Sequence, residues 1–312
     1  MENARGARHA WHGVVVATAL PLRPDLTIDL DAYADHVRWL FASGCDGVCP
    51  NGSLGEYQAL TSAERAQVVR VAVEAAGPGR VVVGCSAYGA AEARGWAEQA
   101  AEAGAAAVLL LPPNGYRAPD RAVIGHFAEV AKVGLPIVAY NNPIDTKVDL
   151  TPELLARLHG EGLIVAVKEF SGDVRRAWQI AEAAPGLDLL IGADDVSVEL
   201  ALAGAVGWIA GYANALPRAS VALYRAAVAG DLPAAAELYR ALHPLLRWDS
   251  RTEFVQAIKL SMDLAGRPGG PCREPRVALD GEQAAEVRRA TEAALWWESG
   301  QLPGRTPVGG SA

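Results

Sequence analysis

Residues 136–169 read PIVAYNNPIDTKVDLTPELLARLHGEGLIVAVKE, and this stretch holds two apolar runs separated by one helix-like segment. The runs at 136–143 and 164–169 show little of the two-residue alternation that a half-exposed strand would have. The segment between them is amphipathic and long enough for a helix. The stretch therefore predicts a strand, a helix and a second strand, with both strands buried in a parallel sheet.

The same pattern repeats along the chain, with eight runs that are each followed by an amphipathic, alanine-rich segment. The runs are residues 14–20, 47–52, 81–86, 107–112, 136–143, 164–169, 187–194 and 207–214. Eight such units favour a (β/α)₈ TIM barrel, and an open, doubly wound sheet is the alternative before any functional motif is considered. After residue 214 only helices are expected, at 218–229, 232–246, 252–265 and 280–298. They predict a C-terminal helical extension packed on the barrel.

Helix starts and loose ends set the expected boundaries of the regions. Asp29 precedes the first helical segment, and Thr61 with Glu64 forms a capping box before another. The polar start and the Gly- and Pro-rich end predict a flexible N-terminus over residues 1–11 and a flexible tail over 299–312. Between them we expect a barrel core over 12–216 and packed helices over 217–298.

Composition excludes several classes of protein. The 312 residues are 51% hydrophobic with a net charge of −8, which suits a globular protein and argues against nucleic-acid binding. The four cysteines form no CxxC pair, so neither a metal site nor a disulfide framework is indicated. The N-terminus lacks a signal-peptide layout, and the apolar run at 13–22 is too short to cross a bilayer. We expect a cytoplasmic protein with no membrane partner and no metal or other cofactor.

Lys168 is the first candidate for chemistry. Functional groups of a parallel barrel lie at the C-terminal ends of its strands, and of the four lysines only Lys168 closes a core run. Burial among apolar walls should lower the pKa of this lysine from about 10.4 and leave a neutral amine that can attack a carbonyl. The alternative is a structural lysine that reaches solvent or pairs with Glu169 or Asp145.

Two other predicted strand ends carry groups that could act together with Lys168. Tyr140 closes the run next to that of Lys168, where a phenol could relay protons during imine formation; the alternative is a core tyrosine. The second run leads into NGSLGEYQAL, where glycines allow a tight backbone and Ser53 can present a hydroxyl beside free N–H groups. Such a loop suits a carboxylate, although most glycine turns are only turns.

Five motifs occur in one order: GSLGE, YNNP, VKEFSGD, IGADD and AGYANALP. Together they resemble the dihydrodipicolinate synthase / N-acetylneuraminate lyase family of class I aldolases over about residues 12–298. The resemblance implies a barrel with C-terminal helices that assembles as a homotetramer, a dimer of dimers. It also implies that Lys168 forms the iminium and that Tyr140 relays protons. Ser53 and the amide of Leu54 would then hold the carboxylate of a small 2-oxo acid.

Other positions refine the expected site. Members that condense aspartate semialdehyde with pyruvate look to carry an arginine where this chain has Asp145, and an acid there should repel a second carboxylate. Asp145, Gly192 and Ile209 are expected to bind substrate. Tyr116 is shifted from the common PYY pattern and is a candidate second relay residue. Asp194 and Asp195 could bind substrate hydroxyls or an amine or, as loop aspartates more often do, cap their loop.

The function predicted from these residues is a Schiff-base-forming lyase that releases or uses pyruvate. Asp145 argues against a true 4-hydroxy-tetrahydrodipicolinate synthase. A second hypothesis is a deaminase or dehydratase of a cyclic imine acid, such as 1-pyrroline-4-hydroxy-2-carboxylate, that uses the same lysine. Two hypotheses of another class are a barrel that binds phosphorylated metabolites, which lacks the expected glycine-rich loops, and a catalytically silent metabolite-binding barrel.

Overall fold

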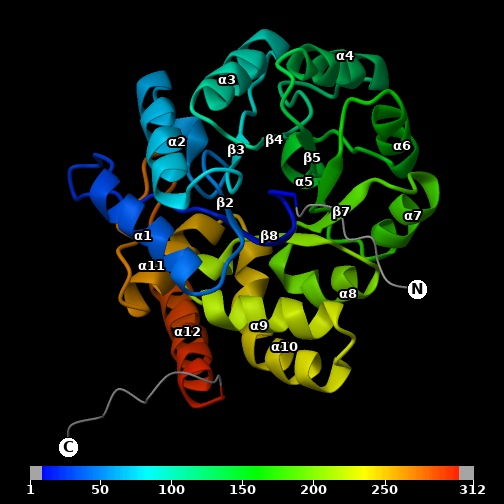
Figure 1. Ribbon diagram of the computed structural model, residues 1–312. Coiled ribbons are helices and arrows are strands. Elements are labelled where there is room, and N and C mark those ends of the chain that lie inside the picture. Colours follow the sequence, from blue (N-terminus) through cyan, green and yellow to red (C-terminus); the bar gives the residue numbers. More distant parts are fainter. Residues whose placement is uncertain (1–8, 302–312) are drawn as a thin grey trace, which may run out of the picture.

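A computed structural model of the protein describes residues 9–301, and Figure 1 shows a central set of strands surrounded by helices. The sheet has eight strands. All of the strand pairings are parallel, in the order β2-β1-β8-β7-β6-β5-β4-β3. The strands are β1 Gly13–Ala17, β2 Gly47–Cys49, β3 Val82–Gly84, β4 Ala107–Leu110, β5 Ile137–Asn141, β6 Ala166–Glu169, β7 Asp188–Ile191 and β8 Gly207–Ala210. Each of them falls within one residue of a predicted run or inside it.

The two ends of this sheet meet and close it into a barrel. Val48 of β2 forms a parallel bridge with Val81, and its N–H donates to the carbonyl oxygen of Arg80 at 3.0 Å. The N–H of Gly84 in β3 donates to the carbonyl oxygen of Pro50 at 2.9 Å. The predicted (β/α)₈ TIM barrel is therefore confirmed, and the open-sheet alternative is wrong.

Helices cover the outside of the barrel and continue past its last strand (Figure 1). Those between strands are α1 Leu30–Ala42, α2 Ser62–Ala76, α3 Ala90–Glu102, α4 Asp120–Ala131, α5 Pro143–Thr146, α6 Pro152–Gly160, α7 Arg175–Ala183 and α8 Ser197–Leu202. After β8 come α9 Pro217–Val228, α10 Leu232–Leu246, α11 Phe254–Leu264 and α12 Gly281–Gln301. Helix α9 packs against α8 and α10, and α12 packs against α10 and α11. The C-terminal helices thus form the expected extension.

The predicted helix starts are confirmed in atomic detail. The side chain of Asp29 accepts a hydrogen bond from the N–H of Ala32 at 3.1 Å, and Thr61 and Glu64 form a reciprocal capping box. Caps of this kind typically stabilise a helix by about 1 kcal/mol. Most strands end earlier than predicted; β2, for example, ends at Cys49 rather than at residue 52. The chain leaves the ladder there to form the loops above the barrel.

Part of each end that was predicted to be flexible lies within the described residues. Trp11 is 4% exposed, and its indole N–H donates to Asp188 at 2.7 Å. Its carbonyl oxygen lies so close to Gly207 that a Cβ there would come within 2.1 Å of it. Trp11 therefore packs at the N-terminal end of the strands, whereas residues 1–8 lie outside the described part. Helix α12 extends to Gln301, and residues 302–312 also lie outside.

Two kinds of feature are absent from residues 9–301. No helix between residues 9 and 301 is both long and apolar enough to span a membrane. In the same part of the chain, no group of three or more His, Cys, Asp or Glu side chains is arranged to hold a metal ion. The four cysteines are free thiols, and three of them are buried.

Candidate active site

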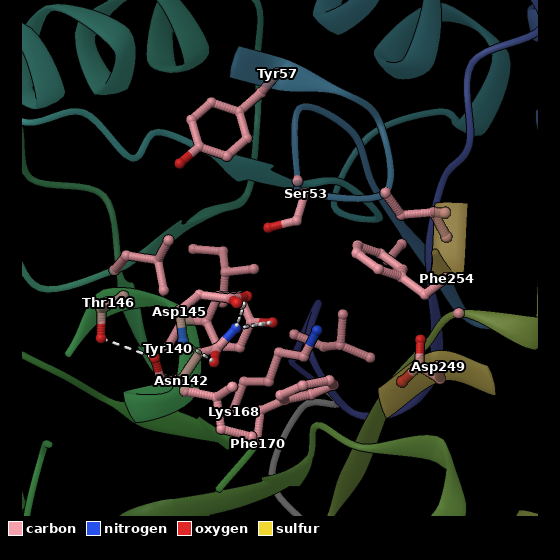
Figure 2. A pocket seen from close by; sticks show the side chains of 18 of the residues that line it. Ser53, Tyr57, Tyr140, Asn142, Asp145, Thr146, Lys168, Phe170, Asp249 and Phe254 are labelled. Atoms are coloured by element: carbon pink, nitrogen blue, oxygen red, sulfur yellow. Dashed lines mark hydrogen bonds between the residues drawn. The ribbon is translucent and has the colours of Figure 1, made fainter. Parts of the chain in front are cut away.

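A cavity of about 320 Å³ opens at the C-terminal ends of the strands, the size of a small-molecule site. Its wall includes Lys168 of β6, Tyr140 of β5, Ser53 from the loop after β2, and Asp249 from the C-terminal extension. Figure 2 shows these side chains directed toward a common space. The structure therefore brings together residues that lie up to about 200 positions apart in the chain, as closure of a barrel requires.

Lys168 is buried in this cavity and does not reach solvent. It is 7% exposed, and it pairs in register with Tyr140 on one side and with Leu190 on the other. Burial lowers the pKa of Lys168, and the nearby carboxylates of Asp249 and Asp194 oppose part of that change. A buried lysine with a lowered pKa presents a larger fraction of neutral, nucleophilic amine.

The two acids proposed as structural partners of Lys168 are engaged elsewhere. Glu169 accepts hydrogen bonds from the side chain of Asn141 at 2.9 Å and from the N–H of Ser171 at 2.6 Å. Asp145 accepts a hydrogen bond from the side chain of Asn142 at 2.8 Å. Successive residues of a strand point to opposite faces, which explains why Glu169 turns away from the cavity. The two ion pairs that would make Lys168 a structural lysine are therefore not formed.

Tyr140 lies beside the amine. The Nζ atom of Lys168 is 4.4 Å from the centre of the Tyr140 ring, and the Tyr140 hydroxyl accepts a hydrogen bond from Asn142 at 3.4 Å. Burial raises the pKa of Tyr140 well above its ordinary value, with Asp249 adding to this effect. The phenol is therefore protonated at neutral pH, and its O–H remains free to donate to a substrate.

The loop after β2 is held by a buried ion pair that the sequence did not predict. Ser53 and Leu54 line the cavity, and Glu56 follows them with a positive φ of 52°. The Glu56 carboxylate accepts from Lys259 of α11 at 2.7 Å and from the N–H of Arg273 at 2.8 Å. The C-terminal segment thereby fixes the position of the loop that was predicted to bind a carboxylate.

The remaining predicted residues divide into two groups. Ile209 and Asp145 line the cavity. Gly192 does not line it; a Cβ at Gly192 would lie 2.2 Å from the carbonyl oxygen of Glu169, so this glycine permits close packing of the ends of β6 and β7. Tyr116 is 61% exposed and also lies outside this cavity in the single chain.

Tyr57 lines the cavity where Tyr116 does not. It belongs to the 3₁₀ helix η1 Tyr57–Ala59, and Figure 2 shows its hydroxyl turned into the pocket. Burial raises the pKa of Tyr57, so this phenol is also protonated at neutral pH. The only signal for it in the sequence is its place directly after the GSLGE motif.

Asp194 has a structural role, but it caps the turn after β8 rather than its own loop, and it does not line the cavity. Its carboxylate accepts hydrogen bonds from the indole of Trp208 at 2.9 Å and from the N–H groups of Gly211 at 3.1 Å and Tyr212 at 2.7 Å. These bonds join the end of β7 to the turn after β8. Burial raises the pKa of Asp194 to about 6 despite the three donors. The structural interpretation of this residue is therefore correct.

Asp249 is the acidic residue that the sequence analysis missed. It lies in the 3₁₀ helix η4 Arg247–Ser250, directly after α10, is 7% exposed, and lines the cavity together with Lys168. Burial raises its pKa well above the ordinary value, and the neighbouring Asp194 raises it further. Asp249 reaches the space above the strand ends from the helical extension, where no pattern in the sequence indicates a site residue.

Comparison with known proteins identifies the family. The family model of the Dihydrodipicolinate synthetase family matches residues 10–294. A 4-hydroxy-tetrahydrodipicolinate synthase of Methanothrix thermoacetophila is 34% identical over 281 residues, which are 89% of this chain and 95% of that protein. An uncharacterized DapA-like lyase of Rhizobium meliloti is 33% identical over 90% of this chain and 97% of its own length.

Solved structures show the same likeness. The crystal structure of YagE from E. coli K12, a prophage protein of the dihydrodipicolinic acid synthase family in complex with pyruvate, superposes with a TM-score of 0.84. That match has 27% sequence identity and covers 91% of this chain and 98% of YagE. On the near full-length match to the family model, this chain belongs to the dihydrodipicolinate synthetase family.

Proposed function

We propose that this enzyme is a class I aldolase-type lyase that forms a Schiff base between Lys168 and a small 2-oxo acid. One observation carries the proposal: Lys168 is buried in the cavity with a lowered pKa, and the protonated phenol of Tyr140 lies beside it. A neutral amine next to a proton donor is what imine formation requires. Family membership supports an enzyme of this type, since its named relatives are synthases and lyases.

The proposed reaction begins with attack of the Lys168 amine on C2 of a pyruvate-like acid. Ser53 and the N–H of Leu54, both at the cavity wall, hold the carboxylate, and Tyr140 relays a proton. The resulting iminium accepts electrons when the C3–C4 bond breaks or when a hydroxyl group leaves. YagE, described in complex with pyruvate, supports a 2-oxo acid of this size.

Asp145 is the basis of our proposal on substrate specificity. It lines the cavity and accepts a hydrogen bond from Asn142, which holds its carboxylate at the wall. In this proposal the distal part of the substrate lies against that wall. A carboxylate there repels a second carboxylate of the substrate. We therefore propose that the natural reaction is not the synthase reaction for which several relatives are named, but cleavage of a substrate with an uncharged distal part.

A second candidate within the family is a deaminase or dehydratase of a cyclic imine acid. The observation that favours it is the presence of two acidic side chains, Asp145 and Asp249, in the wall of one small cavity. Two acids in a wall that also contains Arg251 and Arg276 suit a substrate that carries both a cationic iminium nitrogen and a carboxylate. The same Lys168 would displace this nitrogen from C2 and open the ring, and loss of the hydroxyl as water followed by hydrolysis of the resulting imine at C5 would release ammonia.

One assay separates these candidates. The pure protein is incubated with 4-hydroxy-2-oxoglutarate, with 2-keto-3-deoxy sugar acids and with a hydroxypyrroline carboxylate, and pyruvate and ammonia are followed separately. Pyruvate from a 2-keto-3-deoxy sugar acid supports the aldolase. Pyruvate from 4-hydroxy-2-oxoglutarate, which carries a second carboxylate, would also support an aldolase but would contradict the specificity proposed for Asp145. Ammonia without pyruvate contradicts the aldolase and supports the deaminase. If no product forms and no imine can be trapped, the protein is a silent binding barrel.

The homotetramer and the cytoplasmic location expected from the sequence are part of the same proposal. The exposed aromatic side chains of Tyr88 and Tyr116, 73% and 61% exposed, support burial of this surface in an assembly. Size-exclusion chromatography with light scattering tests the tetramer, and a monomer mass at micromolar concentration would contradict it.

A further inference from the structure

We infer that Asp249 is a second catalytic acid: its carboxyl group protonates the oxygen that leaves when Lys168 forms the imine, and the carboxylate then pairs with the iminium. This inference rests on the proposed Schiff-base function and goes further by naming a residue outside the barrel strands and their loops. It gives the C-terminal extension a part in the chemistry.

The position of Asp249 supports this role. Its carboxyl group lines the same cavity as the Lys168 amine, and the two groups interact electrostatically. Figure 2 shows the amine between Tyr140 on one wall and Asp249 on the other. A carbonyl carbon attacked by this amine would therefore have a proton donor on each side.

The Asp249 side chain forms few structural contacts. Its Oδ2 atom accepts one hydrogen bond, from the N–H of Asp194 at 3.2 Å. Its Oδ1 atom lies against Gly211, where a Cβ would come within 2.5 Å of it, and no hydrogen-bond partner for this oxygen is found among residues 9–301. The absence of a side chain at Gly211 thus leaves space for the Asp249 carboxyl group, and the Oδ1 atom of that group has no hydrogen-bond partner among the described residues.

Several charged and titratable groups lie around Asp249. They are Lys168 of β6, Tyr140 of β5, Asp194 and Asp195 of η2 Asp194–Val196, Tyr212 of η3 Tyr212–Asn214, and the neighbouring Arg251. Arg251 stacks on Trp248 at 4.0 Å and pairs with Glu286 at 3.3 Å, so its charge is compensated there.

These neighbours determine which acid keeps its proton. Asp194 is held by three N–H donors, which favour its negative charge, whereas Asp249 has one. A second carboxylate beside a buried first one is disfavoured, so Asp249 holds a proton while Lys168 is neutral. Once a fixed positive charge appears on the lysine nitrogen, loss of that proton becomes favourable.

The step balances in atoms and charge. The Lys168 amine adds to the carbonyl carbon and, after one N–H proton moves to the oxygen, gives the neutral carbinolamine. Asp249 then donates its proton to the carbinolamine hydroxyl, the C–O bond breaks, and one water leaves. The products are an iminium on Lys168 and a carboxylate on Asp249, which together carry no net charge. Return of the proton during hydrolysis of the imine restores the starting state.

The Asp249→Asn variant tests the inference, because an amide keeps the shape and the acceptor for the Asp194 N–H but cannot donate this proton. The rate at which pyruvate forms a borohydride-trappable adduct is measured by rapid quench. We expect this rate to fall roughly 100-fold, the usual contribution of a general acid. The matched control is Asp195→Asn, which removes the same charge from an acid outside the cavity wall and should change the rate less than about twofold.

The pH profile gives a readout that a purely structural role would not move. The reactive form of the Lys168 and Asp249 pair carries one proton, so the wild-type rate rises with pH as the pair loses its first proton and falls as it loses the second. Asp249→Asn keeps the rise, which belongs to the lysine, and loses the fall. Tyr140→Phe is slower but keeps both limbs, because the pKa of Tyr140 lies well above this range.

The outcomes are distinguishable. An unchanged rate and an unchanged two-limbed profile in Asp249→Asn would overturn the role of Asp249 and leave the Schiff base intact. Absence of any adduct in the wild-type protein would refute the proposed function itself, and this inference with it. If Asp249→Asn does not fold, the wild-type and Tyr140→Phe profiles decide, since a profile without an alkaline limb contradicts the inference.

Discussion

The Lys259→Met substitution should destabilise the protein strongly and weaken binding of the 2-oxo acid. Lys259 and Glu56 form an ion pair at 2.7 Å, and each side chain is only 2% exposed. Methionine matches the length of lysine but cannot donate a hydrogen bond. The substitution therefore leaves the Glu56 carboxylate buried without its cation.

The size of the effect follows from the contacts that remain. Lys259 also donates to the carbonyl oxygen of Pro271 at 2.6 Å, and after its removal Glu56 retains the N–H of Arg273 at 2.8 Å. Removing one partner of a buried pair typically costs about 3–5 kcal/mol, because an uncompensated charge stays in a poorly polarisable interior. Since Glu56 follows the Ser53 loop, the same change should raise KM for the substrate.

Urea denaturation and the KM for a cleaved 2-oxo acid measure both effects. The matched control is Lys132→Met, which breaks an ion pair between Glu129 and a lysine side chain that is 63% exposed, and it should cost less than about 1 kcal/mol. Adding Glu56→Gln to Lys259→Met should recover part of the lost stability. A loss below about 1 kcal/mol in Lys259→Met would refute this reasoning, because it would show that the pair is not buried as described.

Three further changes test other parts of the account. Tyr140→Phe should slow adduct formation by roughly 10²-fold with an unchanged melting temperature, and an unchanged rate in rapid-quench trapping would argue against the relay. Burial lowers the pKa of His36 to about 4, so stability should be full above pH 6.5 and fall as pH drops toward 4; this group contributes about 3 kcal/mol of that loss. Denaturation at pH 7 and pH 4 checks it, and a His36→Gln variant with the same pH dependence would contradict it. Gly192→Ala should cost about 1–3 kcal/mol of unfolding free energy, because its Cβ would lie 2.2 Å from the Glu169 carbonyl oxygen; an unchanged midpoint in urea would show that this packing is loose.

The parts of the fold that depend on local pattern were predictable from the sequence. Apolar runs such as 136–143 and 164–169 contain the buried strands β5 and β6, and the Thr61 capping box is formed as expected. In a parallel barrel, strand order then determines which strand ends meet. For this reason Lys168 and Tyr140 could be placed in one site before the structure was known.

The groups that were missed come from contacts over long sequence distances. Glu56 and Lys259 are 203 positions apart, and Asp249 enters the cavity from a turn after α10. No periodic pattern indicates which residue of a helical extension reaches the barrel mouth. Gly192 was expected to contact substrate, and only backbone geometry shows that its lack of a side chain serves strand packing.

Borohydride reduction in the presence of pyruvate, followed by peptide mass analysis, tests the Schiff base most directly. We predict a mass gain equal to one reduced pyruvate on the peptide that contains Lys168. We also predict that this gain is kept in Lys147→Ala, an exposed lysine, and lost in Lys168→Ala. No mass gain in the wild-type protein, or a gain that survives Lys168→Ala, would contradict the assignment of Lys168 as the nucleophile.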